Sequence, residues 1–318
     1  MKIMILGGSG FVGSHLARRL SRDGHAISVV TRHPNGARHL AIVPRVQIRH
    51  FDPYDVGRLD AELADHDVLI NLVGILNESG RDGAGFRRAH IELVEIAIKA
   101  CNAAGVTRMI QMSALNAGQG ISHYLLTRGE GEQRVRDSGL DWTIFRPSTI
   151  FGPDDSFLDR FAGLLAISPV LPLARADAKF APVYVGDVVE AFARALEDRA
   201  SHGQTYELCG AETLTLRQVV EWVAHQRNMR RLVIALPDAL GRVQGKVFDF
   251  VPGKPFSSDN FKSLLLDSVC NGNGFDSLGI EPWGMREKAT EWLNHTGHGR
   301  QARYQRFRER FGRSGGRA

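Results

Sequence analysis

The sequence predicts an α/β protein with a doubly wound parallel sheet and a smaller, irregular C-terminal region. Three observations predict this fold class: short β-branched runs alternate with helical periodicity over residues 1–150, a glycine-rich turn follows the first run, and this rhythm breaks from about residue 151. The chain has 318 residues, of which 43% are hydrophobic and 24% charged. This ordinary globular composition excludes disordered, collagen-like and disulfide-scaffold designs.

The first half is expected to alternate strands and helices in βαβ units. Each expected helix follows a strand and ends in a glycine-bearing or polar turn. The expected strands lie near residues 2–6, 26–31, 45–51, 67–73, 108–112 and 141–145. The expected helices lie near residues 11–23, 55–64, 86–104 and 123–138.

Residues 151–298 are expected to form a smaller substrate- or partner-binding region that interleaves with the first domain. Prolines punctuate this region after the turn at Gly152. Regular patterns nevertheless return, with strand-like pieces at 181–185 and 205–208 and helical ones at 187–197 and 216–227.

The basic charge of the chain is concentrated at its end. The net charge is +5, but residues 299–318 hold seven Arg and one Glu, so residues 1–298 sum to −1. Within this tail, Tyr304, Phe307 and Phe311 would form an aromatic stripe among arginines on a helix. One hypothesis is that residues 300–311 dock on an anionic membrane surface. The alternatives are a helix packed on the body and, less favoured, a nucleic-acid-binding arm.

The cysteines and the N-terminus bear on cellular location. Cys101, Cys209 and Cys270 are far apart and follow no metal-ligand spacing, so we expect reduced thiols in a reducing compartment. The N-terminal residues enter a strand directly, and no apolar run is long enough to span a bilayer. We therefore expect a cytoplasmic protein, peripheral on the inner face of the membrane if the tail docks there.

The first turn carries a phosphate-binding pattern. The apolar run 2–6 is followed by Gly7, Gly10 and Gly13 and then by a helix. Glycines at these positions permit a tight turn, a close backbone approach to a pyrophosphate and close packing of helix on strand. Because the N-terminus of the helix also favours anionic phosphate, we expect a Rossmann-type dinucleotide site.

The end of the second strand bears on the choice of cofactor. NAD-binding folds place an acidic residue there for the ribose hydroxyls, whereas an arginine accommodates a 2′-phosphate. This chain reads Thr31-Arg32 with no acid, so NADP(H) is favoured over NAD(H). The alternative is that Arg32 is a solvated loop residue and that either cofactor binds.

Together these features resemble the short-chain dehydrogenase/reductase superfamily in its extended or atypical branch, which is NAD-dependent epimerase/dehydratase-like. The resemblance rests on the glycine turn, Asp52, and the runs 71–74 and 146–153, and it covers most of residues 1–270. Further runs resemble bacterial relatives of the 39 kDa accessory-subunit family of respiratory complex I; they lie at 112–115, 129–132, 141–144, 155–157, 181–188 and 206–208. The resemblance implies NADP(H) binding, with several members structural or associated with lipids and quinones.

The resemblance also implies which residues hold the cofactor. The pyrophosphate would be held by Gly7, Gly10, Phe11, Val12 and Gly13, and the adenosine ribose would lie at Thr31 and Arg32. The adenine would lie at Asp52, and the cofactor would then run along Leu72, Val73 and Gly74. The nicotinamide would lie near Pro147, Ser148 and Thr149. Asp52 could equally be an ordinary residue of the turn 52–55.

Catalytic residues are implied in the same way. Hydride-transferring members use a Tyr as general acid, a Lys four residues later that favours the phenolate, and a Ser that orients the carbonyl. Here Tyr124 and Ser113 match, but the lysine position holds Arg128. Arginine keeps the charge yet cannot lose a proton, so the two are not interchangeable. Alternatively, Tyr124 is an ordinary helix-start aromatic and Arg128 pairs with Glu132 on a solvated face.

Two function classes follow from these residues. The first is an NADP(H)-dependent oxidoreductase acting on a small carbonyl, quinone or isoprenoid-like substrate. The second is a non-catalytic NADP(H)-bound structural, assembly or redox-sensing protein of a membrane respiratory or quinone-related complex. The histidines show no ligand spacing, and His90 is expected to be a packed or cofactor-side residue, so no metal is predicted.

Overall fold

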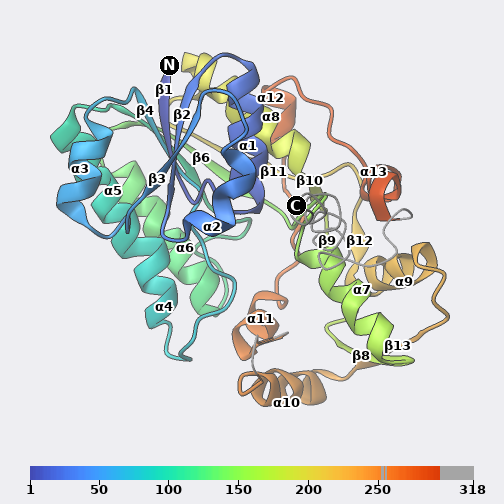
Figure 1. Ribbon diagram of the computed structural model, residues 1–318. Helices are drawn as coiled ribbons and strands as arrows, with labels where there is room; N and C mark the ends of the chain where they lie inside the picture. The colour runs from blue at the N-terminus through green and yellow to red at the C-terminus, as the bar shows by residue number, and fades with distance from the viewer. Residues whose placement is uncertain (252–253, 255, 294–318) are drawn as a thin grey trace, which may run out of the picture.

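The computed structural model describes residues 1–251, 254 and 256–293. It has two parts, which Figure 1 shows side by side: a large sheet covered by helices on both faces, and a smaller part of short strands and helices. The tail stripe of Tyr304, Phe307 and Phe311 lies outside the described residues. Within these described ranges, no helix is both long and apolar enough to cross a membrane.

The large sheet has seven strands, all parallel, in the order β11-β6-β5-β4-β1-β2-β3. Its strands are β1 (Lys2–Leu6), β2 (Ala26–Thr31), β3 (Val46–His50), β4 (Val68–Asn71), β5 (Arg108–Met112), β6 (Asp141–Pro147) and β11 (Gln204–Leu208). The predicted doubly wound parallel sheet is therefore confirmed, and all six strands predicted in the first half are present within a few residues.

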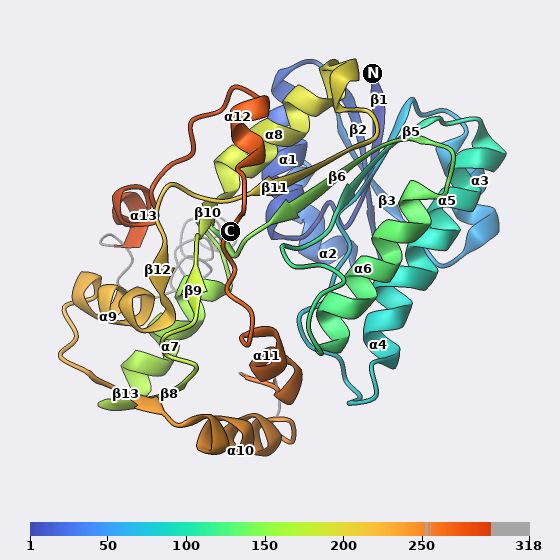
Figure 2. The same ribbon diagram turned by 180° about the vertical axis from the view of Figure 1, so that it is seen from behind.

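Alternating side chains of the strands supply two hydrophobic layers. Ile3 and Ile5 of β1 pack in one cluster with α1 and α8, whereas Met4 and Leu6 pack in another with α3, α5 and α6. Figures 1 and 2 show these helices on the two opposite faces of the sheet. The helices are α1 (Phe11–Arg22), α3 (Val56–Leu63), α5 (Leu93–Ala104), α6 (His123–Arg136) and α8 (Val185–Glu197).

The helix predicted over 86–104 is interrupted near its start. It begins as α4 (Ala84–Arg87), passes through a wide π-helical turn, η2 (Arg88–Glu92), and continues as α5. The wide turn lies where His90 is buried, and such turns often occur at functional sites. Short helical turns also follow β2 and α8, namely α2 (Pro34–Ala37), η1 (Arg38–Leu40) and η3 (Arg199–Ser201).

The smaller part has its own hydrophobic cluster, which includes Leu158, Leu171, Val219 and Val233. Its helices are α7 (Phe157–Ile167), α9 (Leu216–Gln226), α10 (Asp238–Phe248), α11 (Ser258–Ser263) and α13 (Met285–Leu293). Its two-stranded sheets pair β7 (Ile150–Phe151) with β10 (Val183–Tyr184), β9 (Lys179–Phe180) with β12 (Leu214–Thr215), and β8 (Val170–Ala174) with β13 (Leu232–Leu236). The turn α12 (Gly274–Ser277) packs on β11 instead.

One expectation about the cysteines is wrong. Cys209 and Cys270, which are 61 residues apart in the chain, form a disulfide. Cys209 directly follows β11, and the segment of Cys270 lies along that strand, because Asn271 N donates to Glu207 Oε2 (3.3 Å). Cys101 is buried and free, and burial raises the pKa of its thiol to about 12. The expected reducing, cytoplasmic location therefore loses its main support.

Candidate functional site

A cavity of about 1330 Å³ lies at the carboxyl ends of the sheet strands and extends into the smaller part. Its lining includes Gly7 after β1, Thr31 of β2, Leu72 after β4, Met112 of β5 and Pro147 of β6. The strand order reverses at β1, which lies between β2 and β4. Ligands of open α/β sheets bind at such a switch point.

The glycine turn forms one wall of this cavity. Gly7 has φ +76°, a left-handed conformation that suits glycine, and its carbonyl oxygen accepts a hydrogen bond from Gly10 N (3.0 Å). A Cβ atom at Gly13 would lie 2.5 Å from both Gly7 O and Gly8 Cα. Gly10 is the N-cap of α1, and no side chain caps that end of the helix. The turn is thus a backbone-lined cradle at a helix N-terminus, which fits a pyrophosphate.

Thr31 and Arg32 end β2 and both line the cavity. The Thr31 hydroxyl oxygen accepts hydrogen bonds from Ser9 Oγ (3.3 Å) and His33 N (3.1 Å), which tie the end of β2 to the glycine turn. Arg32 is exposed at the cavity edge, and no carboxylate of β2 lies beside it.

All the predicted cofactor residues line the cavity except Asp52. Asp52 is exposed, and its Oδ1 accepts a hydrogen bond from Tyr54 N (3.3 Å), as a turn residue does. Pro53 and Tyr54 line the cavity in its place, and the Arg88 guanidinium lies 4.5 Å from the centre of the Tyr54 ring. Sequence reasoning missed Tyr54 and Arg88; the aromatic residue that follows the third strand was the available signal.

Tyr124 stands in the first turn of α6, whose N-terminus is capped twice. Ser122 Oγ accepts from Leu125 N (3.1 Å), and the Asp259 carboxylate of α11 accepts from His123 N (2.7 Å) and Tyr124 N (3.0 Å). The Tyr124 ring also contacts the rings of Phe86 and His90 edge-on, with centroids 6.1 and 5.5 Å away. Residues from three separate segments therefore fix the position of Tyr124.

Arg128 lies one turn further along α6 and is only 6% exposed. Its Nη1 donates to Met112 O (3.0 Å) and Val73 O (3.4 Å), at the ends of β5 and β4. The guanidinium fills the space beside Gly74, where any Cβ atom would collide with it. Its carbon Cζ is 5.5 Å from the centre of the Tyr124 ring. The structure thus brings a cation and a phenol together in the cavity wall.

Ser113 follows β5 and joins Tyr124 and Arg128 in lining the cavity. Its backbone N donates to Phe145 O (2.7 Å), but its hydroxyl is buried and has no hydrogen-bond partner. A buried hydroxyl without a partner is rare in proteins. The Ser148 hydroxyl, in contrast, is engaged by Ser268, with oxygens 2.8 and 2.9 Å away.

His90 has a structural position behind this cluster. Its Nε2 accepts from Ile75 N (3.3 Å), so the proton of the neutral ring is assigned to Nδ1, which lies 2.9 Å from Thr127 Oγ1. Burial, and to a lesser extent the charge of Arg128, lower the pKa of His90 to about 2. Among the residues that the structure describes, no group of three His, Cys, Asp or Glu side chains could hold a metal.

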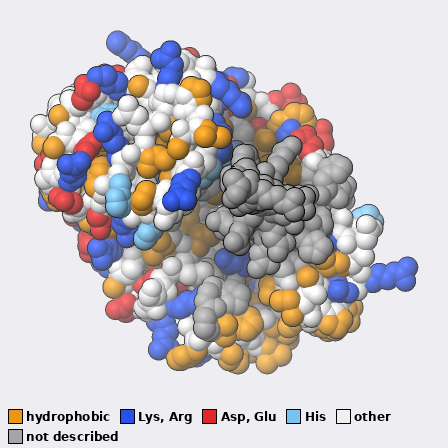
Figure 3. Space-filling view, in the orientation of Figure 1, with side chains coloured by type: hydrophobic (Ala, Val, Ile, Leu, Met, Phe, Trp, Pro, Cys, Tyr) orange, Lys and Arg blue, Asp and Glu red, His pale blue; other side chains and the backbone are white. Residues whose placement is uncertain are grey.

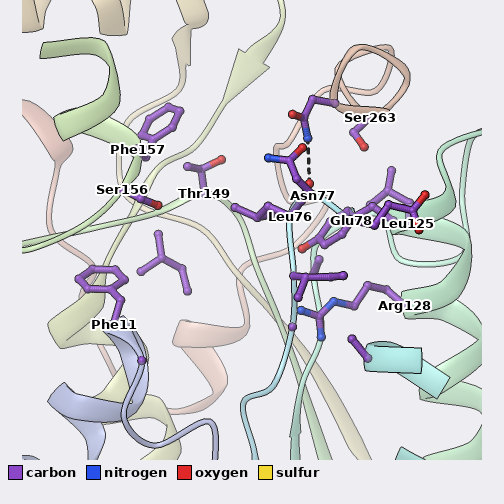
Figure 4. Close-up of a pocket in the computed structure, with 18 of the residues that line it drawn as sticks. Phe11, Leu76, Asn77, Glu78, Leu125, Arg128, Thr149, Ser156, Phe157 and Ser263 are labelled. Atoms are coloured by element: carbon purple, nitrogen blue, oxygen red, sulfur yellow. Dashed lines mark hydrogen bonds between the residues drawn. The ribbon is translucent and has the colours of Figure 1, made fainter. Parts of the chain in front are cut away.

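The half of the cavity formed by the smaller part is apolar. Aromatic and aliphatic side chains come from α7, β8 and α10, whereas α11 contributes Asn260 and Ser263. Among the described residues of this part, Arg160 is the one charged residue in the lining. Figure 4 shows Phe157 and Thr149 on one side of the space and Leu76, Leu125 and Arg128 on the other. The site therefore joins a cradle for an anion, a polar cluster and an apolar compartment.

Comparisons with known proteins agree with this site. A family model described as NAD(P)H-binding matches residues 7–156. The chain is 29% identical over 308 residues to the mitochondrial "NADH dehydrogenase [ubiquinone] 1 alpha subcomplex subunit 9" of Arabidopsis thaliana, covering 91% of this chain and 76% of the relative. It is 30% identical over 251 residues to the "Ceramide reductase" of Caulobacter vibrioides, covering 74% of each.

A solved structure shares the fold. The UDP-glucose 4-epimerase of Thermotoga maritima, solved with UDP-glucose, superposes with a TM-score of 0.75 at 17% identity, covering 93% of this chain and 98% of that one. At this identity the likeness shows the fold alone.

Proposed function

Because this chain belongs to the short-chain dehydrogenase/reductase superfamily of NAD(P)-binding proteins, we propose that it is an NADP(H)-dependent reductase of a ketone or quinone carbonyl carried on an apolar chain. One observation carries the proposal: Ser113, Tyr124 and Arg128 all line the cavity that also includes the glycine cradle and the apolar compartment. Each of these three regions corresponds to one requirement of the reaction, namely cofactor, proton donor and substrate.

The cradle fits a dinucleotide because its turn is closely packed without side chains: a Cβ atom at Gly13 would collide with the backbone of Gly7 and Gly8 and displace the turn. Gly7, Gly10 and the first turn of α1 would hold the pyrophosphate through backbone N–H groups. We propose NADP(H) over NAD(H), because Arg32 stands at the end of β2 where an NAD-binding fold has an acid. The cofactor, when bound, supplies a hydride at its nicotinamide ring.

The side chains of the polar cluster would divide the remaining work. The Tyr124 phenol donates the proton that the carbonyl oxygen needs, and the partnerless Ser113 hydroxyl hydrogen-bonds that oxygen. Arg128 keeps a positive charge beside the phenol ring. Because its Nη1 donates to two backbone carbonyl oxygens, Arg128 holds position and does not relay a proton.

The apolar compartment supports the substrate class. A nucleotide sugar carries phosphates and hydroxyls, yet the described residues of the smaller part contribute one charged side chain, Arg160, to the lining. The relative named "Ceramide reductase" acts, by its name, on a lipid, which supports an apolar chain here as well. Burying each methylene of such a chain contributes about 0.8 kcal/mol.

A second candidate function has its own observation. Arg128 stands where hydride-transferring members have Lys, and other relatives are named as complex I subunits. These facts favour a non-catalytic protein in which bound NADP(H) stabilises the fold, in a structural, assembly or redox-sensing role within a membrane complex.

Oxidation of NADPH by the purified protein tests the proposal. The assay would use quinones and 2-ketones of increasing chain length, with UDP-glucose as the polar control. We expect kcat/KM to rise with chain length, by about fourfold per buried methylene at most. If NADPH raises Tm but no substrate is turned over, the second candidate replaces the first. If NADPH does not bind at all, both candidates are wrong.

A further inference from the structure

The exposed aliphatic side chains of this protein gather at one end of the smaller part. Among the described residues, nine of the seventeen exposed large hydrophobic side chains lie in or beside α7, β8, β13 and α10. We call seven of them the outer apolar face: Val170, Leu232, Ile234, Leu240, Val243, Val247 and Phe250. Figure 3 shows hydrophobic and basic side chains together at this lower end of the molecule. A gathering of this kind usually marks an interaction site.

Helix α10 contributes a regular stripe to this face. Leu240, Val243 and Val247 are spaced i, i+3 and i+7 and are 54%, 54% and 55% exposed. The opposite side of α10 packs through Gly241 and Gly245, where a Cβ atom would lie 2.9 Å from the Phe261 ring and 3.2 Å from the Ser258 backbone. The inner side of α10 is thus closely packed, and its apolar stripe faces solvent.

The sheet of β8 and β13 continues the face. Leu232 and Ile234 are exposed, whereas Val233 between them is buried. The parallel register places Leu232 opposite Val170, which is also exposed. The Gln244 side chain of α10 donates to Pro172 O of β8 (3.1 Å), which joins the helix to the sheet. Helix and sheet therefore pack side by side, each with exposed apolar side chains, at the end of the molecule away from the large sheet (Figures 1 and 2).

The charges around this face are complementary to an anionic surface. Arg230, Arg242 and Lys246 are exposed beside the apolar side chains. The two acidic residues of the same segment are engaged within the protein: Asp238 with Arg175 (3.2 Å), and Asp249 with the backbone N (3.1 Å) and hydroxyl (2.6 Å) of Ser258. Aliphatic side chains rimmed by cations suit the headgroup region of a bilayer with acidic lipids.

The same elements form the wall of the apolar compartment. Gln244 and Phe248 of α10 and Leu171 and Leu173 of β8 line the cavity, on the inner side of elements whose outer side carries the outer apolar face. In β8, Val170 is exposed and lies outside the cavity lining, whereas the buried Leu171 and Leu173 line the cavity. One layer of secondary structure thus separates the compartment from solvent.

We propose that the outer apolar face docks on the surface of an anionic phospholipid bilayer. Docking there holds the apolar compartment one layer of secondary structure, α10 and β8, away from the lipid in which an apolar substrate would dissolve. The link to an apolar substrate rests on the proposed reductase function, whereas the docking does not.

Vesicle flotation of the full-length protein tests the docking. The vesicles would consist of phosphatidylcholine alone or mixed with phosphatidylglycerol. We expect the wild type to float with the vesicles, and more so with phosphatidylglycerol. The double variant Val243→Glu/Val247→Glu should lower the bound fraction at least tenfold, because it puts two carboxylates on the stripe. Both residues are more than half exposed, so Tm should stay close to that of the wild type.

The matched control is Ile42→Glu/Ile121→Glu, which changes two aliphatic residues that are 87% and 60% exposed and lie outside the cavity lining. This control should bind vesicles as the wild type does. Equal flotation of the stripe variant and the wild type would overturn the proposal and assign binding to another part of the chain. If the wild type binds no vesicles, and light scattering shows that it forms a dimer which the stripe variant loses, the face is assigned instead to contact with a second copy of this chain. NADPH binding, measured separately, reports on the reductase proposal alone.

Discussion

The Arg128 guanidinium lies 5.5 Å from the centre of the Tyr124 ring, one turn away on α6. This spacing of four residues is the one that the family resemblance implies for a catalytic Tyr and Lys. Here the cation is tied to Met112 O and Val73 O, at the ends of two neighbouring strands. The pair therefore places a cation that cannot lose its proton beside a phenol.

Removing the Tyr124 hydroxyl should abolish turnover. In Tyr124→Phe we expect kcat to fall by about 10²–10⁴, because general acid catalysis contributes a factor of this size. The Kd for NADPH should change by less than about twofold, since the phenol is assigned to the substrate carbonyl. The matched control is Tyr206→Phe, which changes a tyrosine outside the cavity lining. Unchanged rates in Tyr124→Phe would show that another group supplies the proton.

Reversing the charge at Arg32 should change cofactor preference. We expect Arg32→Asp to raise the Kd for NADPH by about 10- to 100-fold, because a charged hydrogen bond contributes about 1.5–3 kcal/mol. The Kd for NADH should fall or stay constant, since the new carboxylate can accept from ribose hydroxyls. Fluorescence titration with both nucleotides measures this. Arg22→Asp, at the far end of α1 and outside the lining, makes the same charge change and should alter neither Kd.

The buried neutral His90 should make stability depend on pH. Its pKa is about 2 in the folded protein, against 6.5 for an unperturbed histidine, so only the unfolded chain gains the proton between these values. Stability is therefore fully present above pH 6.5 and is lost as pH falls below it, by about 2 kcal/mol at pH 5. His90→Gln should lack this component.

Denaturant unfolding of both proteins at pH 7 and pH 5 checks the His90 prediction. Asp155 and Asp187 have pKa values raised to about 6, mainly by burial, so the folded protein takes up protons there before the unfolded chain does. Their effect on stability is therefore opposite to that of His90: it increases as pH falls. Both proteins contain them, so the difference between wild type and variant isolates His90. An identical pH dependence in the two proteins would contradict the assignment of a buried neutral ring.

The Cys209–Cys270 bond should contribute substantially to stability. It closes a loop of 61 residues, for which the chain-entropy model gives about 4 kcal/mol. We expect a reductant to lower Tm, and mass spectrometry of the oxidised, unfolded protein to find only Cys101 open to alkylation. Cys101→Ser is the control, because it removes a thiol without touching the bond. Alkylation of all three cysteines without reductant would contradict the disulfide.

Local sequence patterns predicted the large sheet and its cofactor turn well. The strand 2–6 and the glycine turn that follows it lie within about a dozen consecutive residues, so their structure can be predicted from residues that are close together in the sequence. Helix α10 was not predicted, since Gly241 and Gly245 weaken the helical signal; in the fold they allow close packing on Phe261 and Ser258. The reason for a glycine at these two positions is a tertiary contact, which the local sequence does not reveal.

The residues of the site also divide into those that local sequence predicts and those that only tertiary contacts bring together. Thr31 and Leu72 could be assigned because they end strands of one parallel sheet, whose carboxyl ends meet at one edge. Arg88 and the capping carboxylate of Asp259 could not, because the wide turn and α11 reach the site only through the packing of distant segments. The Cys209–Cys270 bond was missed for this reason too.

Binding of NADPH to the wild type and to Gly13→Ala tests the central claim most directly, because a Cβ atom at position 13 would collide with the backbone of Gly7 and Gly8 and displace the cradle. Gly36→Ala is the control, since no atom lies within 4 Å of the Cβ position there. We predict saturable binding by the wild type and the control, and at least tenfold weaker binding by Gly13→Ala once its fold is verified by circular dichroism. No saturable binding by the wild type, or an unchanged Kd in folded Gly13→Ala, would contradict the assignment of this cavity to a dinucleotide.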